Sequence, residues 1–217
     1  MLIAAGHQVT GTTRSPDRAA WLQGVGAEPA VLDVFDADAL RDAVVQARPG
    51  IVIHQLTDLA AGFGPDALRA NAMLRQVGTR NLVAATLAAR AGRLIAQSGA
   101  WLYADGPLPH LETDPLRSPG DFPDDPVLPG ILELERLVTQ TPGSDGIVLR
   151  YGFLYGPGTV TSKPGDLPSV HVAAAARAAL LAVDRGAGGI YNVVDEGAEV
   201  SGLRARSELG WDPDARA

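Results

Sequence analysis

The chain has 217 residues, a length that suits a single domain with a sizeable hydrophobic core. Its 18 basic and 25 acidic side chains give a net charge of −7 without any basic block, which argues against a nucleic-acid partner. The sequence contains no cysteine, so disulfides, thiolate catalysis and cysteine metal sites are excluded, and its four histidines share no spacing typical of metal ligands.

The apolar runs are too short for a membrane span. Runs such as Ala173–Ala176 and Ala178–Val183 fall well below the ~20 apolar residues that a transmembrane helix needs. The first residues lack the basic leader of a secretory signal peptide. We therefore expect a cytoplasmic protein that does not associate with membranes.

In the first hundred residues, apolar β-rich runs alternate with helical stretches rich in alanine, leucine and arginine, which predicts parallel βαβ units. Residues 1–6 have the pattern of a helix end stopped by a glycine, and a strand is expected at Gln8–Thr13. Ser15 as N-cap, followed by a proline, predicts a helix over Pro16–Val25. Further along, we expect strands at Ala30–Asp33, Gly50–Leu56 and Arg93–Gln97, and helices at Asp38–Ala47 and Asp66–Ala91.

Residues 104–130 differ from the rest of the chain. They are rich in proline, aspartate and glycine, which predicts a long irregular segment, and segments of that length are commonly functional or disordered. After it, we expect helices at Leu132–Thr139 and Val170–Val183, and strands at Gly146–Tyr151 and Gly189–Val194.

Three candidate binding residues, Thr13, Arg14 and Asp33, stand at the ends of predicted strands. Where a dinucleotide's ribose is bound, an acidic residue accepts hydrogen bonds from a free 2′-hydroxyl, whereas Thr13 and Arg14 would suit a 2′-phosphate. The alternative for Arg14 is an ordinary exposed arginine. Asp33 can either meet the amino group of an adenine or cap the following helix from the turn 33–36.

Two further polar residues lie in apolar surroundings. Ser98 follows a buried strand, at the carboxyl edge where open α/β sheets bind ligands, so its hydroxyl could donate to a substrate oxygen; the alternative is a simple turn serine. Asn71 interrupts an apolar helical face, and a buried amide needs partners, so we expect it to bond neighbouring backbone.

The most specific motif is residues 149–158, Leu-Arg-Tyr-Gly-Phe-Leu-Tyr-Gly-Pro-Gly. Two tyrosines four residues apart stand between a β-rich run and a Gly-Pro-Gly turn. Three later segments support it: His171-Val172, residues 190–193 (Ile-Tyr-Asn-Val) and residues 208–213 (Glu-Leu-Gly-Trp-Asp-Pro).

Taken in chain order, from Ala4 to Trp211, these segments resemble the extended or atypical short-chain dehydrogenase/reductases, the NAD-dependent epimerase/dehydratase group. The resemblance implies an α/β fold with a Rossmann-like doubly wound parallel sheet, in one domain over residues 1–217. It also implies that residues 152–217 contribute a shortened substrate-binding part.

The resemblance further implies a cofactor, NADP or NAD, and a small-molecule substrate. The residues expected to bind the cofactor are Thr13, Arg14, Asp33, Val34, Leu56, Thr57 and Asn71. Those expected to serve catalysis are Ser98, which would orient the substrate oxygen, and Tyr103 or Tyr155, which would donate a proton. No metal is expected.

The sequence departs from the family pattern in two places. The first strand and the glycine-rich phosphate loop of the family are not found before residue 8. The family's catalytic tyrosine and the lysine four residues later fall on Val127 and Ile131, and the sole lysine, Lys163, has Thr159 four residues before it. The usual acid is therefore missing together with the lysine that lowers its pKa.

Other groups could supply the acid, although an unassisted tyrosine, with a pKa of ~10, is poor at neutral pH. By position these are Tyr103, Tyr151 and Tyr155, with His110 and Glu112 if the irregular segment folds over the pocket.

Two functions remain open. The first is an NAD(P)-dependent oxidoreductase or epimerase acting on a small polar, sugar- or polyketide-like substrate. The second is a non-catalytic Rossmann-like protein with little or no affinity for a cofactor. A sheet without its central strand exposes unpaired edges, so we also expect a homodimer or low stability.

Overall fold

The structure is a computed structural model that describes residues 1–58, 62, 64–120, 125–197 and 199–216. It is an α/β fold in which every pair of adjacent named strands is parallel, so the expected doubly wound Rossmann-like architecture is confirmed. The main sheet has the order β3-β4-β5-β8, and its strands are β3 (Ile51–His54), β4 (Arg93–Gly99), β5 (Asp145–Tyr151) and β8 (Gly189–Val193).

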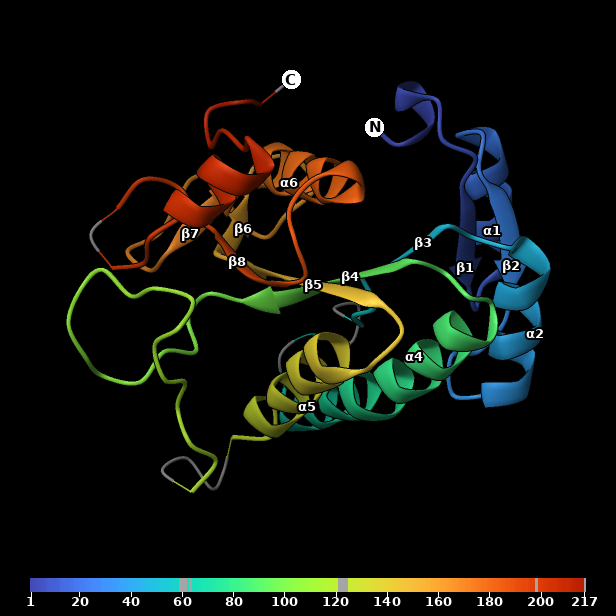
Figure 1. Ribbon diagram of the computed structural model, residues 1–217, viewed down its shortest axis with the longest axis horizontal. Coiled ribbons are helices and arrows are strands. Elements are labelled where there is room, and N and C mark those ends of the chain that lie inside the picture. Colours follow the sequence, from blue (N-terminus) through green and yellow to red (C-terminus); the bar gives the residue numbers. More distant parts are fainter. Residues whose placement is uncertain (59–61, 63, 121–124, 198, 217) are drawn as a thin grey trace.

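Helices cover both faces of this sheet (Figure 1). On one face lie α3 (Pro65–Met73), a π-helical turn η2 (Leu74–Gly78), α4 (Thr79–Ala88) and α5 (Leu128–Gln140). On the other face lies α6 (Val172–Asp184), with a second π-helical turn η3 (Ala205–Leu209) beside it.

The core follows the two-residue period of the strands. Leu94 and Ala96 of β4 pack with Leu134 of α5, whereas Ile95, between them, packs with the opposite cluster that includes Ala178 of α6. A central parallel strand is covered on both faces, and this explains the near-continuous burial of β4 and β5.

A second, two-stranded sheet stands beside the first. It is formed by β1 (Thr10–Thr13) and β2 (Glu28–Val31), with α1 (Pro16–Gly24) between them and a 3₁₀ turn η1 (Ile3–Ala5) before them. The helix α2 (Ala37–Ala47) connects it to the main sheet by packing against α4. Among the described residues, β1 pairs only with β2 and β3 only with β4.

A third small sheet consists of β6 (Phe153–Tyr155) and β7 (Ser169–His171), beyond the carboxyl end of β5. The helix α6, expected over Val170–Val183, begins at Val172. Val170 belongs to β7, where it pairs with Leu154, and His171 caps the helix because its Nδ1 accepts the N–H of Ala173.

Several predicted boundaries were wrong. The strand expected at Ala30–Asp33 ends at Val31, since the Asp33 carboxylate accepts the backbone N–H of Phe35 and starts a turn. The helix expected at Leu132–Thr139 begins at Leu128, inside the segment expected to be irregular. There the Asp125 carboxylate accepts the N–H groups of Val127 and Leu128.

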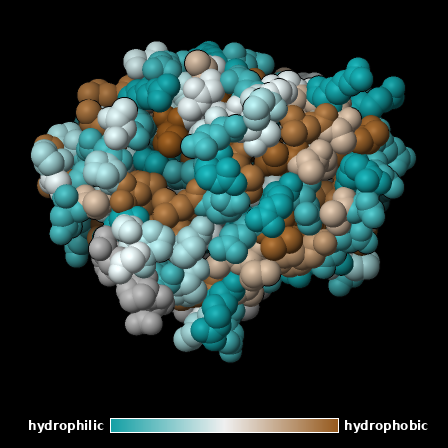
Figure 2. Space-filling view, turned by 60° about the horizontal axis from the view of Figure 1, so that its bottom comes forward, coloured by the Kyte–Doolittle hydropathy of each residue, from teal (hydrophilic) through white to brown (hydrophobic). Residues whose placement is uncertain are grey.

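The side of the molecule below the sheet in Figure 1 carries hydrophobic patches that are separated by hydrophilic side chains (Figure 2). None of the described helices is long and apolar enough to cross a bilayer.

Candidate functional site

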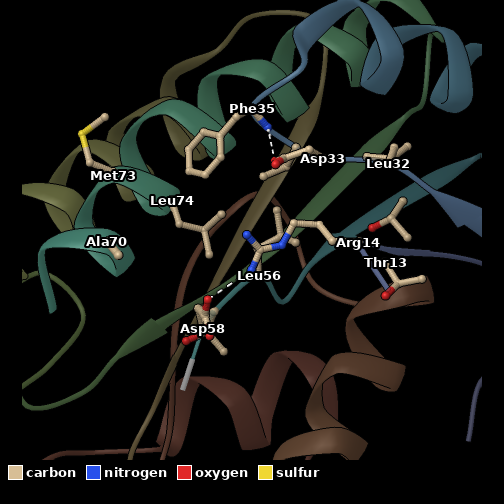
Figure 3. A pocket seen from close by; sticks show the side chains of 13 residues that line it. Thr13, Arg14, Leu32, Asp33, Phe35, Leu56, Asp58, Ala70, Met73 and Leu74 are labelled. Atoms are coloured by element: carbon tan, nitrogen blue, oxygen red, sulfur yellow. Dashed lines mark hydrogen bonds and ion pairs between the residues drawn. The ribbon is translucent and has the colours of Figure 1, made fainter. Parts of the chain in front are cut away.

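A cavity of about 360 Å³ opens where three strands end. Its walls come from the residues that follow β1, β2 and β3, and from one side of α3 and η2 (Figure 3). In parallel sheets the carboxyl ends of the strands share one edge, which is where ligands of open α/β folds bind.

Six of the seven residues expected to bind a cofactor line this cavity, although they come from three separate parts of the chain. They are Thr13, Arg14, Asp33, Val34, Leu56 and Thr57. Apolar side chains make up much of the wall, among them Leu32, Leu56 and Leu74, and they suit the flat faces of a purine ring.

Arg14 carries the positive charge of the cavity. Its guanidinium is well exposed and forms an ion pair of 3.1 Å with the carboxylate of Asp58 (Figure 3). Thr13 supports the same strand end, because its hydroxyl oxygen accepts the N–H of Ser15 at 3.1 Å. The sequence reasoning missed Asp58, which lies in a loop without any periodic signal.

Asp33 holds its own turn and also faces the cavity. Its carboxylate accepts the N–H of Phe35 at 2.9 Å, so it caps the turn between β2 and α2. Helix α2 itself is capped by Asp36, which accepts the N–H of Ala39 at 3.0 Å. The loop is held from the other side by Asn81, whose amide donates to the carbonyl of Val34 at 2.9 Å.

Asn71 is the seventh expected residue, and it lies behind the cavity wall. It is buried, and its amide nitrogen donates to the carbonyls of Asp58 (2.7 Å) and Ala67 (3.2 Å). Its amide oxygen accepts from the Asp58 N–H (2.8 Å) and the Thr57 hydroxyl (3.1 Å). Asn71 therefore bonds to backbone, as expected, and it fixes the segment that follows β3.

Ser98 lies in a buried ion-pair network at the end of β4. Its hydroxyl donates to the Glu135 carboxylate at 2.5 Å, and that carboxylate also receives two donors of Arg150, at 2.7 and 2.9 Å. Both charged side chains are less than one-tenth exposed. The hydroxyl proton of Ser98 is thus used in a hydrogen bond within the protein. The Ser98 oxygen can still accept a hydrogen bond from a ligand, but the hydroxyl does not donate one.

Tyr103 belongs to the same network. Its hydroxyl donates to the side-chain oxygen of Asn192 at 2.6 Å and accepts from Arg150 at 2.9 Å. Burial raises the pKa of the Tyr103 phenol, and the neighbouring Arg150 charge opposes that rise. His110 stacks on the Tyr103 ring with 4.9 Å between centroids, and Glu112 accepts the Asn192 N–H, so the irregular segment does fold onto this network.

Tyr155 lies in a different cluster. Its hydroxyl donates to the Asp195 carboxylate at 2.7 Å and accepts from Arg216 at 3.2 Å. The rings of Tyr155 and His171 meet in a T-shaped arrangement, with 5.2 Å between their centroids. Burial, followed by the contact with Asp195, raises the pKa of Tyr155. The structure therefore brings Ser98 and Tyr103 together and places Tyr155 elsewhere.

A second cavity, of about 400 Å³, lies between β3, the end of β5 and α6. Its lining is mainly apolar, with Gln55 and Tyr151 as its polar residues. Burial raises the pKa of Tyr151, and a hydrogen bond with Gln55 opposes that rise. Gln55 and Leu56 are consecutive and line the second and the first cavity respectively, so the two cavities flank the carboxyl end of β3.

An aromatic pair lies beyond the ends of β4 and β5. The rings of Trp101 and Phe153 stack with 4.5 Å between centroids and an interplanar angle of 27°. A Cβ on Gly99 would come within 2.6 Å of the Trp101 ring, so only glycine at position 99 lets the indole lie there. Phe153 is 41% exposed.

Among the described residues, no group of three histidine, aspartate or glutamate side chains could hold a metal ion. The lining of the first cavity offers groups complementary to an adenine ring and a phosphate, and the Asp58 carboxylate also lies against Arg14. The cavity combines apolar walls with a carboxylate at Asp33 and a guanidinium at Arg14, where an adenine amino group and a phosphate find partners.

Comparison with known proteins points the same way. A family model described as NAD(P)H-binding matches residues 1–125. A 3-diazoavenalumate denitrifying reductase of a Streptomyces species is 38% identical over 220 residues, covering 90% of this chain and 70% of that protein. A 4-hydroxy-2-methyl-3-oxo-4-farnesyl-3,4-dihydroquinoline-1-oxide ketoreductase of Stigmatella aurantiaca is 26% identical and covers 92% of this chain and 64% of that protein.

Solved structures share the fold. The UDP-glucose 4-epimerase of Thermotoga maritima, with UDP-glucose, superposes with a TM-score of 0.81 at 16% identity, over 98% of this chain and 88% of that one. The UDP-glucose 4-epimerase of Thermus thermophilus, in complex with NAD, gives a TM-score of 0.76 at 19% identity, over the same shares of the two chains.

Proposed function

Because this chain belongs to the NAD(P)H-binding family, within the short-chain dehydrogenase/reductase group, we propose that it is a reductase that uses a nicotinamide dinucleotide, with NADP favoured by Arg14. The observation that carries the proposal is the convergence of six expected residues, from three strand ends, on one cavity. In this proposal Arg14 and Thr13 hold the 2′-phosphate, Asp33 accepts from the adenine amino group, and Leu32, Leu56 and Leu74 cover the ring.

The second cavity extends the proposal to the other half of the cofactor. The two cavities flank the carboxyl end of β3 at Leu56 and Gln55, and in this proposal the dinucleotide passes over that strand end, with one flat end in each cavity. The nicotinamide, when bound, supplies a hydride. Tyr151 and Gln55 supply the polar contacts on that side, and the alanines of α6 supply an apolar surface that excludes water.

The substrate that we propose has a flat, apolar part. Trp101 and Phe153 stand at the carboxyl edge, and the ring of Phe153 is open to solvent on part of its surface. Stacking of this kind favours planar partners, adding ~0.5–1.5 kcal/mol per aromatic pair. This narrows the small polar, sugar- or polyketide-like substrate of the sequence hypothesis to one with a conjugated ring.

The reaction that we propose needs little help from a protein acid. The hydroxyl protons of Ser98, Tyr103 and Tyr155 are all donated to acceptors within the protein, and the pKa values of both tyrosines are raised. A carbonyl that accepts hydride becomes an alkoxide and needs a proton. A diazonium carbon instead forms a C–H bond with the hydride while its C–N bond breaks, so that neutral N₂ departs as the leaving group and no proton is needed. The 38% identical relative is a reductase of a diazo compound, whose nitrogen is such a leaving group.

Because the hydroxyl protons of Ser98, Tyr103 and Tyr155 are all used in hydrogen bonds within the protein, a second candidate function is binding of the cofactor without turnover. In that case Ser98, Tyr103 and Tyr155 are structural residues, and the protein acts through its bound nucleotide or a partner.

Titration of NADPH with the purified protein, followed by nicotinamide fluorescence, tests the proposal. We expect saturable binding at micromolar concentration and NADPH oxidation with an aromatic diazo compound, but none with a simple ketone. Saturable binding without oxidation of NADPH by any substrate would favour the second candidate function. Absence of binding at millimolar cofactor would overturn both candidate functions, because each requires a bound nucleotide.

A further inference from the structure

The ion pair between Arg14 and Asp58 lies in the mouth of the first cavity. Arg14 directly follows β1, whereas Asp58 belongs to the loop after β3, and their side chains meet at 3.1 Å (Figure 3). The group expected to attract a 2′-phosphate therefore already holds a carboxylate.

The backbone of Asp58 is held in place near Arg14 by Asn71. The Asn71 side chain forms two hydrogen bonds with the Asp58 backbone: its amide oxygen accepts the Asp58 N–H at 2.8 Å, and its amide nitrogen donates to the Asp58 carbonyl at 2.7 Å. The remaining bonds of the Asn71 amide go to Thr57 and Ala67, so both donors and both lone pairs are used. Release of the loop would leave a buried amide without partners, which costs ~1–3 kcal/mol for each group.

The formal charge of the cavity is negative. Its charged lining residues are one arginine, Arg14, and two aspartates, Asp33 and Asp58, so that the net charge is −1. A 2′-phosphate carries about −1.5 to −2 charges at neutral pH and would have to displace Asp58 from Arg14 while remaining beside it. A ribose 2′-hydroxyl is neutral and can donate to the Asp58 carboxylate.

We propose that Asp58, held in place by Asn71, sets the balance between NADP and NAD by opposing the 2′-phosphate at Arg14. This inference rests on the proposed function, because it assumes that the cavity takes the adenosine half of a nicotinamide dinucleotide. With Asp58 present, the preference that Arg14 gives to the phosphorylated cofactor is weakened. Without its charge, Arg14 is free and the cavity prefers the phosphorylated cofactor.

Calorimetric titration of NADPH and NADH into the wild type and D58N tests the proposal. We expect the dissociation constant of NADPH to fall about tenfold in D58N, a change of ~1.4 kcal/mol, with a change of less than about twofold for NADH. The matched control is D66N, which removes the same charge from an exposed aspartate on α3 that pairs with Arg69 and lies outside the cavity lining. It should leave both affinities unchanged.

N71A separates positioning from charge. If Asn71 acts through Asp58, N71A should move the NADPH to NADH affinity ratio in the same direction as D58N, and the double variant should add nothing further. Because N71A removes buried hydrogen bonds and could fail to fold, D58N, whose side chain is partly exposed, is the deciding variant.

Equal effects of D58N on both cofactors, or no effect on either, would overturn the inference while leaving the proposed function intact. Absence of binding of either cofactor to the wild type and to every variant would overturn the proposed function, and this inference with it.

Discussion

Replacement of Glu135 by glutamine tests whether the buried network at the end of β4 supports the fold. Glu135 accepts two hydrogen bonds from Arg150 and one from Ser98, and both charged partners are nearly inaccessible to solvent. E135Q keeps the size of the side chain but leaves the Arg150 charge buried without a counter-charge.

Loss of one partner from a buried ion pair costs ~3–5 kcal/mol, because the remaining charge stays desolvated. Glutamine can still accept one hydrogen bond, so we expect the lower end of that range, ~3 kcal/mol. In a domain of this size each kcal/mol lowers the melting temperature by ~2–4 °C, so E135Q should melt ~6–12 °C below the wild type.

The measurement is thermal unfolding followed by circular dichroism, with E133Q as the matched control. Glu133 lies two residues away on α5 and pairs at the surface with Arg136 and Arg80. Exposed pairs contribute ~0–1 kcal/mol, so E133Q should melt within ~4 °C of the wild type. Equal melting temperatures for the two variants would refute the assignment of a stabilising role to the buried network.

Three further predictions follow from other contacts. R14A should weaken NADP binding far more than NAD binding in a fluorescence titration, and equal losses would remove Arg14 from the phosphate site. The pKa of His54 is lowered to about 4, first by burial and then by Arg75. Between pH 6.5 and 4, His54 is therefore protonated in the unfolded chain but neutral in the folded protein. The free energy of unfolding should fall by ~3 kcal/mol as the pH drops through this range. Urea denaturation of the wild type and H54N over that range checks this, and identical pH slopes would contradict it. Finally, β1 and β3 each have an edge without a strand partner among the described residues, and we expect these edges to make the chain dimeric or poorly stable. A monomer in size-exclusion chromatography that melts above ~65 °C would count against that expectation.

The part of the site that the sequence could predict is the part governed by strand ends. Thr13, Arg14, Leu56 and Thr57 stand at the ends of expected strands, and parallel topology alone brings such residues to one edge. The sequence also predicted that Asn71 would bond backbone, because a polar residue on an apolar helical face needs partners.

The contacts between distant residues could not be predicted. Ser98 and Glu135 are 37 residues apart, and Arg14 and Asp58 are 44 apart, in segments whose relative register no local pattern records. The start of α5 was missed for another reason. Its prolines suggested a loop, although Pro129 stands in the first turn of the helix, where a missing N–H costs nothing.

The division of the strands into two sheets has a mechanical consequence. No backbone hydrogen bond joins β1 to β3 among the described residues, so the unit that contains β1 and β2 is attached through side chains and connecting loops. Such a unit can open locally at lower free energy than the main sheet. Arg14 and Asp33 belong to this unit, whereas Leu56 and Asp58 belong to the part that contains the main sheet. A ligand in the first cavity would contact both parts and would therefore oppose their separation. Bound nucleotide should therefore slow amide hydrogen exchange in β1 and β2 more than in β4 and β5.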